Sequence, residues 1–115
     1  MMGIAVNATD PEGRTVMSLA GELDLSQVPV AEQTLRSIER RKPETLVIDL
    51  SGLTFIDSSG LRLVLEADQR ARLDGRRLVL IQGPETVHRV FLIALLDKRL
   101  EFIRDLSELG GDDGD

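Results

Sequence analysis

The stretch LVIDLSGLTFIDSSGLRLVLEA, residues 46–67, decides which fold this chain can take. Its first residues, with the preceding Thr45, form the short apolar run Thr45–Leu50, which is rich in β-branched residues and typical of a strand buried on both faces. We interpret SGLTFID as the loop that follows. A helix is then expected from Ser58 or Ser59 to about Asp74, with Gly75 ending it. Strand, loop and helix in this order form the unit from which parallel sheets are built.

The residues before this stretch predict two strands and a helix. IAVNA and RTVMSLAG are expected to pair as a hairpin through the turn DPEG, residues 10–13. In the helix that follows, Ser26 is the expected N-cap, Pro29 lies in the first turn and Pro43 stops the helix. Apolar residues at helical spacing mark its inner face: Val28, Ala31, Leu35 and Ile38.

The residues after this stretch continue the alternation of strand and helix. RRLVLIQ predicts a second central strand, and GPETVHRVFLIALL predicts a helix that starts at Pro84. LEFI, residues 100–103, is the last expected strand, and Leu106 and Leu109 indicate a final helical turn. The expected inner stripe of the last long helix comprises Val87, Val90, Phe91, Ala94 and Leu95. Leu92, Ile93 and Leu96 are left over, so either the final segment covers them or they form a patch for a partner or a second copy.

The predicted order of elements is β-β-α-β-α-β-α-β. It indicates a single α/β domain over residues 1–109, with a mixed four- to five-stranded sheet and helices mainly on one face. The remaining residues 110–115, GGDDGD, are expected to be an acidic disordered tail.

Composition excludes several classes of function. The chain has 115 residues, enough for one domain, and 3% aromatic residues, too few for stacking on single-stranded nucleic acid. Its formal charge of −6 gives no attraction to nucleic acid or to an anionic membrane. No cysteine is present, so thiolate chemistry and disulfides are excluded. Without a signal peptide or an apolar run long enough to span a bilayer, a cytoplasmic location is expected.

The chemistry of interest lies at Asp57-Ser58-Ser59-Gly60, where a central strand gives way to a helix. Sites in open α/β sheets gather at this end of the strands. The residues alone leave two interpretations of Ser58 and Ser59 open. The serines are an ordinary N-cap, or one of them is a chemical switch whose added phosphate would meet the positive end of the helix dipole.

Three motifs at these separations carry a resemblance to a known family. GELD at Gly21–Asp24, DLSGLTFIDSSGL at Asp49–Leu61 and the downstream run RRLVLIQGPETVHRVFLIALL together resemble a STAS domain. More narrowly, they resemble the anti-sigma factor antagonists, over about Ile4–Leu106. One departure is local: the family often has a small residue and a glycine before the leucine that ends the last helix, and this chain has Ala94-Leu95-Leu96.

The resemblance implies a mechanism of partner switching. An unmodified antagonist binds an anti-sigma factor that is also a serine kinase, and so frees the sigma factor. The kinase phosphorylates the first serine after the aspartate, here Ser58; the antagonist is then released, and a serine phosphatase resets it. The kinase brings ATP and Mg²⁺, so the chain itself needs no cofactor or metal, has no catalytic residue and is not an enzyme. Asp24, Asp57, Ser59 and Gly60 are expected to bind the partner, with Ser59 as an alternative acceptor.

Two rival functions remain for comparison. In the first, the chain is a STAS scaffold subunit or ligand-sensing module whose serines are structural. In the second, it is a receiver domain phosphorylated on Asp49, but IAVNATD lacks the acidic pair that receivers need, and Lys42 and Lys98 are poorly placed. The expected partners are thus proteins rather than nucleic acid or membrane, and the chain is expected to be a monomer or a weak homodimer.

Overall fold

A computed structural model describes residues 3–10 and 14–109 of the chain. The turn expected at 10–13 lies largely outside the described residues, and the expected tail at 110–115 lies wholly outside them. Five strands, three α-helices and a short 3₁₀ helix follow one another in the order β1 (Ile4–Thr9), β2 (Thr15–Leu23), α1 (Val28–Arg40), β3 (Thr45–Ile56), α2 (Ser58–Leu73), β4 (Arg77–Ile81), α3 (Glu85–Ile93), β5 (Phe102–Ile103) and η2 (Leu106–Leu109). This is the order that the sequence predicts.

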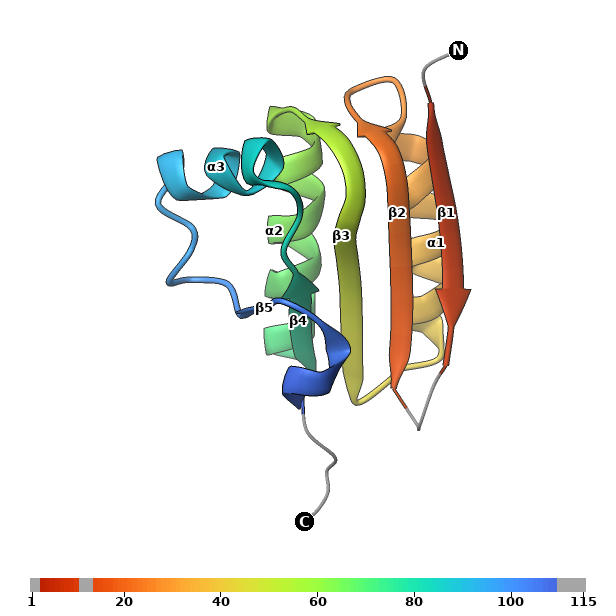
Figure 1. The fold of residues 1–115 in the computed structure, drawn as a ribbon. Coiled ribbons are helices and arrows are strands. Elements are labelled where there is room, and N and C mark those ends of the chain that lie inside the picture. Colours follow the sequence, from red (N-terminus) through yellow and green to blue (C-terminus); the bar gives the residue numbers. More distant parts are fainter. Residues whose placement is uncertain (1–2, 11–13, 110–115) are drawn as a thin grey trace.

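The five strands form one mixed sheet in the order β1-β2-β3-β4-β5 (Figure 1). β1 and β2 pair antiparallel, as expected for a hairpin, and the other neighbours pair parallel. Because α1 and α2 connect parallel strands, both cross the same face of the sheet. The predicted mixed sheet with helices mainly on one face is confirmed.

The main core lies between the sheet and these helices. Each helix turns a stripe of aliphatic residues toward the sheet, as the periodicity predicts: Ala31, Leu35 and Ile38 of α1 are all fully buried. α3 adds Val87 and Phe91 to the same core. Nearly all of the burial is aliphatic, because the chain has few aromatic side chains.

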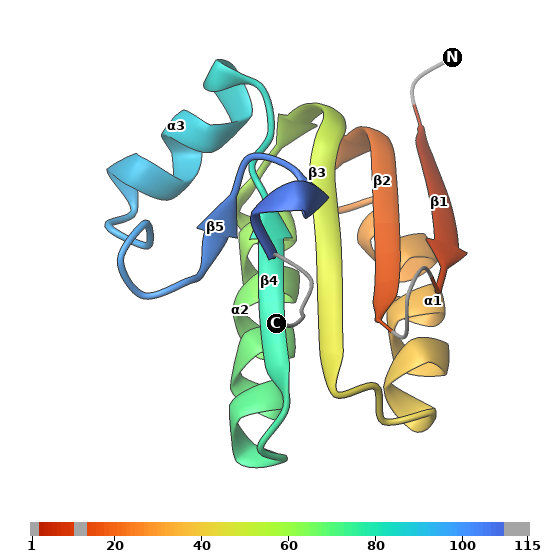
Figure 2. The same cartoon turned by 60° about the horizontal axis from the view of Figure 1, so that its bottom comes forward.

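The opposite face of the sheet has a smaller cover. Val16, Val47 and Val79 from three adjacent strands form a second buried cluster, on which Leu106 and Leu109 of η2 pack. Figure 2 shows η2 in front of the sheet, on the side away from α1 and α2. The expected final helical turn is therefore present, and the C-terminal segment closes the second face.

β3 is longer than the sequence predicts. The segment interpreted as a loop, SGLTFID, continues the strand to Ile56, with Leu53 and Ile56 buried. The pairing with β2 is kept through two register shifts, and a Cβ on Gly52 would come within 2.8 Å of the Leu19 carbonyl oxygen. The Ser51-Gly52 pair, which suggests a loop, instead allows a bulged strand to pass close to its neighbour.

α3 is shorter than predicted. It ends at Ile93, and the expected inner residues Ala94 and Leu95 are exposed. The Leu96 N–H donates to the Phe91 carbonyl and the Leu95 N–H donates to the Leu92 carbonyl, at 2.9 and 3.0 Å. These bonds form a Schellman cap, with Leu95 left-handed at φ 61°. The sequence Ala94-Leu95-Leu96, which departs from the family pattern, therefore contains the left-handed residue that follows the end of the helix.

Candidate functional site

The candidate site lies where β2 and β3 end and α2 begins, at the top of the sheet in Figure 1. Leu23 and Ile56 are paired at the last position of the two strands, and the Asp57 N–H donates to the Leu23 carbonyl at 3.2 Å. The loop after β2 and the start of α2 therefore lie side by side. Two of the sequence motifs, GELD and FIDSSG, meet at this point.

Asp57 is the residue that caps α2. Its backbone is extended, with φ −112° and ψ −172°, and its Oδ1 accepts hydrogen bonds from the N–H groups of Ser59 and Gly60 at 2.9 and 3.1 Å. Its Oδ2 accepts from the Leu25 N–H at 3.0 Å. A single carboxylate thus satisfies two donors of the helix terminus and fixes the loop after β2.

Ser58 is the first residue of α2 and its side chain is exposed. Within the described residues its hydroxyl makes no hydrogen bond. The interpretation of this serine as an N-cap is wrong, because the Asp57 carboxylate occupies the donors that a serine cap would use. The Ser58 hydroxyl is free and open to solvent.

Ser59 and Gly60 lie progressively deeper. Ser59 is half-buried, and its N–H is held by Asp57. Gly60 is buried, and a Cβ there would come within 2.7 Å of both the Leu23 carbonyl oxygen and the Ile56 side chain. The close approach that Gly60 permits is that of α2 to the sheet.

Asp24 is engaged within its own turn. Its Oδ1 accepts from the Ser26 hydroxyl at 2.8 Å and from the Gln27 N–H at 3.1 Å. Ser26 was expected to cap α1, but the N-cap position is Gln27 and no side chain caps it. The Asp24 carboxylate builds this turn, because it accepts both from the Ser26 hydroxyl and from the backbone N–H of Gln27. Asp24 thus shapes the loop that lies beside Ser58.

Two exposed apolar side chains flank this site. Leu25 is 73% exposed and Phe55 is 47% exposed. Leu25 is joined to Asp57 by a hydrogen bond, and Phe55 precedes Asp57 by two residues. The sequence reasoning did not single them out, because Phe55 fell in an expected loop and Leu25 in a segment without a clear period. Burying such side chains against a partner would remove apolar surface from water.

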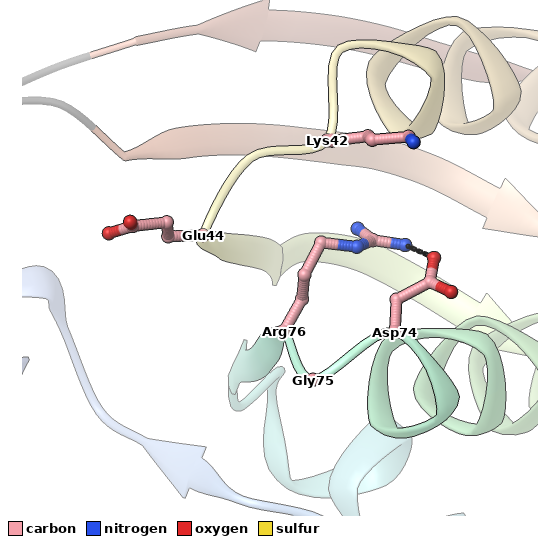
Figure 3. A pocket seen from close by; sticks show the side chains of 5 residues that line it. All are labelled: Lys42, Glu44, Asp74, Gly75 and Arg76. Atoms are coloured by element: carbon pink, nitrogen blue, oxygen red, sulfur yellow. Dashed lines mark hydrogen bonds and ion pairs between the residues drawn. The ribbon is translucent and has the colours of Figure 1, made fainter.

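A shallow hollow lies at the other end of the sheet, between the connections that lead into β3 and β4 (Figure 3). Arg76 and Asp74 form an ion pair there at 2.9 Å, Lys42 lies on the same side, and Glu44 points away. These groups balance in charge and lie far from Ser58 along the strands. Among the described residues, no group of histidine or acidic side chains is placed to hold a metal ion.

Fold and site together define a small mixed α/β domain that presents an exposed serine hydroxyl at the start of a helix. The chain belongs to the STAS domain family: the family model described as "Mlab, STAS domain" matches residues 6–106. No helix among the described residues is long and apolar enough to cross a membrane.

Known members of the family support the same class. The chain is 29% identical to the anti-sigma-F factor antagonist RsfB of Mycobacterium tuberculosis, over 91% of this chain and 85% of that protein. The crystal structure of an anti-sigma factor antagonist from Mycobacterium paratuberculosis matches with a TM-score of 0.85 and 25% identity, over 92% and 90% of the chains. RsbS of Moorella thermoacetica, solved as a serine-to-glutamate variant, matches with a TM-score of 0.72 and 26% identity, over 89% and 88%. The first two of these relatives are named as anti-sigma factor antagonists.

Proposed function

We propose that this protein is an anti-sigma factor antagonist that binds a serine kinase–anti-sigma factor and is switched off by phosphorylation of Ser58. The observation that carries the proposal is the free hydroxyl of Ser58 at the start of α2. Because Asp57 caps the helix, Ser58 has no structural duty in the described fold. The related anti-sigma factor antagonists supply the partner class.

The proposed reaction is a phosphoryl transfer from ATP, catalysed by the partner. A bond forms between the Ser58 Oγ and the γ-phosphorus, the bond from that phosphorus to the β-phosphate oxygen breaks, and ADP leaves. The hydroxyl proton passes to a base of the kinase, which also holds the Mg²⁺. A serine phosphatase reverses the modification by adding water, which restores the hydroxyl and releases inorganic phosphate. The exchange takes place in the cytoplasm, where sigma factors act.

Phosphorylation disfavours binding without unfolding the domain. The phosphate adds a charge of about −1.5 to −2 beside the Asp57 carboxylate and close to the loop that carries Asp24. A docked protein covering this surface would have to desolvate that charge or approach it with its own acidic groups. The affinity falls tenfold for each 1.4 kcal/mol of such repulsion. The helix cap is retained because it depends on Asp57.

The apolar side chains beside the hydroxyl provide the attraction. Leu25 and Phe55 are exposed in the free protein, and burying them against a partner removes apolar surface from water. Asp24 and Ser59 supply the polar margin of the same surface. The proposal thus places the anchors and the switch within a few residues of one another.

The direct test is incubation of this protein with candidate serine kinase–anti-sigma factors of the same organism. We expect mass spectrometry after incubation with ATP and Mg²⁺ to find one phosphate, lost in Ser58→Ala and kept in Ser59→Ala. A phosphate on Ser59 would move the switch to the neighbouring residue. Absence of any phosphate, with binding unaffected by ATP, would favour a scaffold or ligand-sensing STAS module.

A further inference from the structure

The first turn of α2 has few donors to offer a phosphate on Ser58. The N–H groups of Ser59 and Gly60 both donate to the Asp57 carboxylate, and the Leu61 N–H donates to the Asp57 carbonyl at 3.0 Å. A helix terminus stabilises an anion mainly through such N–H groups. With these donors occupied, the phosphate has to find its counter-charge among side chains.

Arg62 is the cation placed to supply that counter-charge. It follows Ser58 by four residues in the same helix, and both side chains are exposed. Residues at this spacing lie one above the other on a helix surface, and helical side chains lean toward the N-terminus. At this spacing the side chain of Arg62 can reach the turn that carries Ser58.

Arg62 also has no competing partner among the residues that the structure describes. Arg70 and Arg72 of the same helix pair with Glu39 and Asp68, at 3.1 and 2.8 Å, whereas no hydrogen bond or ion pair is found for Arg62. Its guanidinium fork matches the geometry of a phosphate and can donate two bonds to it.

We infer that Arg62 is an internal partner of the phosphorylated serine, binding the phosphate on Ser58 across one turn of α2. The inference rests on the proposed function for the occurrence of that phosphate. Phosphorylation then changes the surface twice: it adds a dianion at Ser58 and withdraws the charge of Arg62 from an approaching protein. The phosphate and the Arg62 guanidinium then lie side by side on the surface of α2.

The test measures the second pKa of the phosphate by ³¹P NMR. Phosphoserine is introduced at position 58 by genetic encoding, so no kinase is needed, and the wild-type background is compared with Arg62→Gln, Arg62→Lys and Arg40→Gln. Arg40 is an exposed arginine at the far end of α1, so its variant makes the same change of charge away from the site. The acidic neighbours Asp24 and Asp57 are the same in every protein compared.

We expect Arg62→Gln to raise the second pKa of the phosphate by about 0.3 to 0.5 at low salt, since Arg62 favours the dianion. Arg62→Lys should restore much of the difference, Arg40→Gln should leave the pKa unchanged, and 0.5 M NaCl should reduce the effect. Equal pKa values in the Arg62→Gln and Arg40→Gln proteins would overturn the inference. Because the phosphate is encoded, a kinase that fails to modify Ser58 would count against the proposed function alone.

Discussion

α2 and α3 both begin at the same end of the parallel sheet, yet their first turns are built differently. At α2 a carboxylate accepts from two N–H groups of the helix and from the loop after β2. At α3 the N-cap is Pro84, no side chain caps the helix, and only the Pro84 carbonyl accepts, from Val87 and His88. The start of α2 is therefore capped by a side chain that also binds a neighbouring loop, whereas the start of α3 has no side-chain cap.

The difference leaves the serine at the start of α2 without a capping role. Where one residue caps the helix, the next is free to carry chemistry, so the fold does not depend on whether Ser58 is modified. In α3 the two roles of cap and free serine are both missing, because its first turn has neither a capping side chain nor a serine. The proposal therefore places the regulated surface at the start of α2.

The largest effect on stability is expected at Gly60, where α2 packs closely on the sheet. Gly60→Val should lower the free energy of unfolding by about 2 to 3 kcal/mol, because the new side chain meets the Leu23 carbonyl and Ile56. Urea denaturation measures the change. Gln69→Val, at an exposed position of the same helix, should cost about 0.5 kcal/mol. Similar losses in the two variants would show that α2 does not pack as closely as described.

Because Asp57 caps α2 and Ser58 does not, substitutions of these two adjacent residues should differ in their cost to stability. Asp57→Ala should cost about 1 to 2 kcal/mol of stability, because two helix donors and the Leu25 N–H lose their acceptor. Ser58→Ala should stay within about 0.5 kcal/mol of wild type. Chemical denaturation of the two variants side by side would contradict the account if Ser58→Ala proved the more costly change.

The end of α3 offers a test through a left-handed leucine. Leu95→Gly should raise the free energy of unfolding by about 0.5 to 1 kcal/mol, because glycine adopts φ 61° without strain and the leucine side chain is 81% exposed. Leu73, the last residue of α2, is 80% exposed in a right-handed conformation, so Leu73→Gly should lower stability by about 1 kcal/mol. Changes of the same sign in thermal melts would contradict the Schellman cap.

The smallest effect is expected at the β4–β5 edge, away from both helix starts. Arg77 donates to Glu101, and this hydrogen bond holds the pKa of the Glu101 carboxyl below its ordinary value. The pair therefore adds stability above the ordinary pKa and loses it as the pH falls through the lower, folded value. Glu101→Gln should cost up to about 0.5 kcal/mol at pH 7, and the cost should shrink as the pH falls through the lowered pKa of Glu101. A cost that does not change between neutral and strongly acidic pH would argue against the ion pair.

Sequence reasoning succeeded where local and tertiary signals agree. The α1 stripe, the end of α2 before Gly75 and the buried run of β3 are all decided by periodicity and by glycine. It failed where a residue takes a conformation foreign to its type: nothing about Leu95 predicts a left-handed backbone, and nothing in Ser51-Gly52 distinguishes a bulged strand from a loop. Such features depend on neighbours far away in the sequence.

The candidate site was predictable in place and less so in the roles of its residues. Asp57, Ser58 and Ser59 all favour helix caps, so composition alone does not say which one accepts the N–H groups. The structure assigns the cap to Asp57 and leaves Ser58 free. The sequence alone suggested that Gly60 contacts a partner. Its actual burial against Leu23 depends on the pairing of β2 with β3, which the sequence does not reveal.

The measurement that tests the central claim most directly is the affinity of the anti-sigma kinase for four forms of this protein. These are the wild type, Ser58→Ala, the form phosphorylated on Ser58, and Ser37→Glu, which adds charge at an exposed position of α1 away from the site. We predict that Ser58→Ala and Ser37→Glu bind within about threefold of wild type, whereas the phosphorylated form binds at least about a hundredfold more weakly, which corresponds to about 2.8 kcal/mol. All four should melt at similar temperatures. Equal affinity of the phosphorylated and unmodified forms, or unfolding on phosphorylation, would contradict the account.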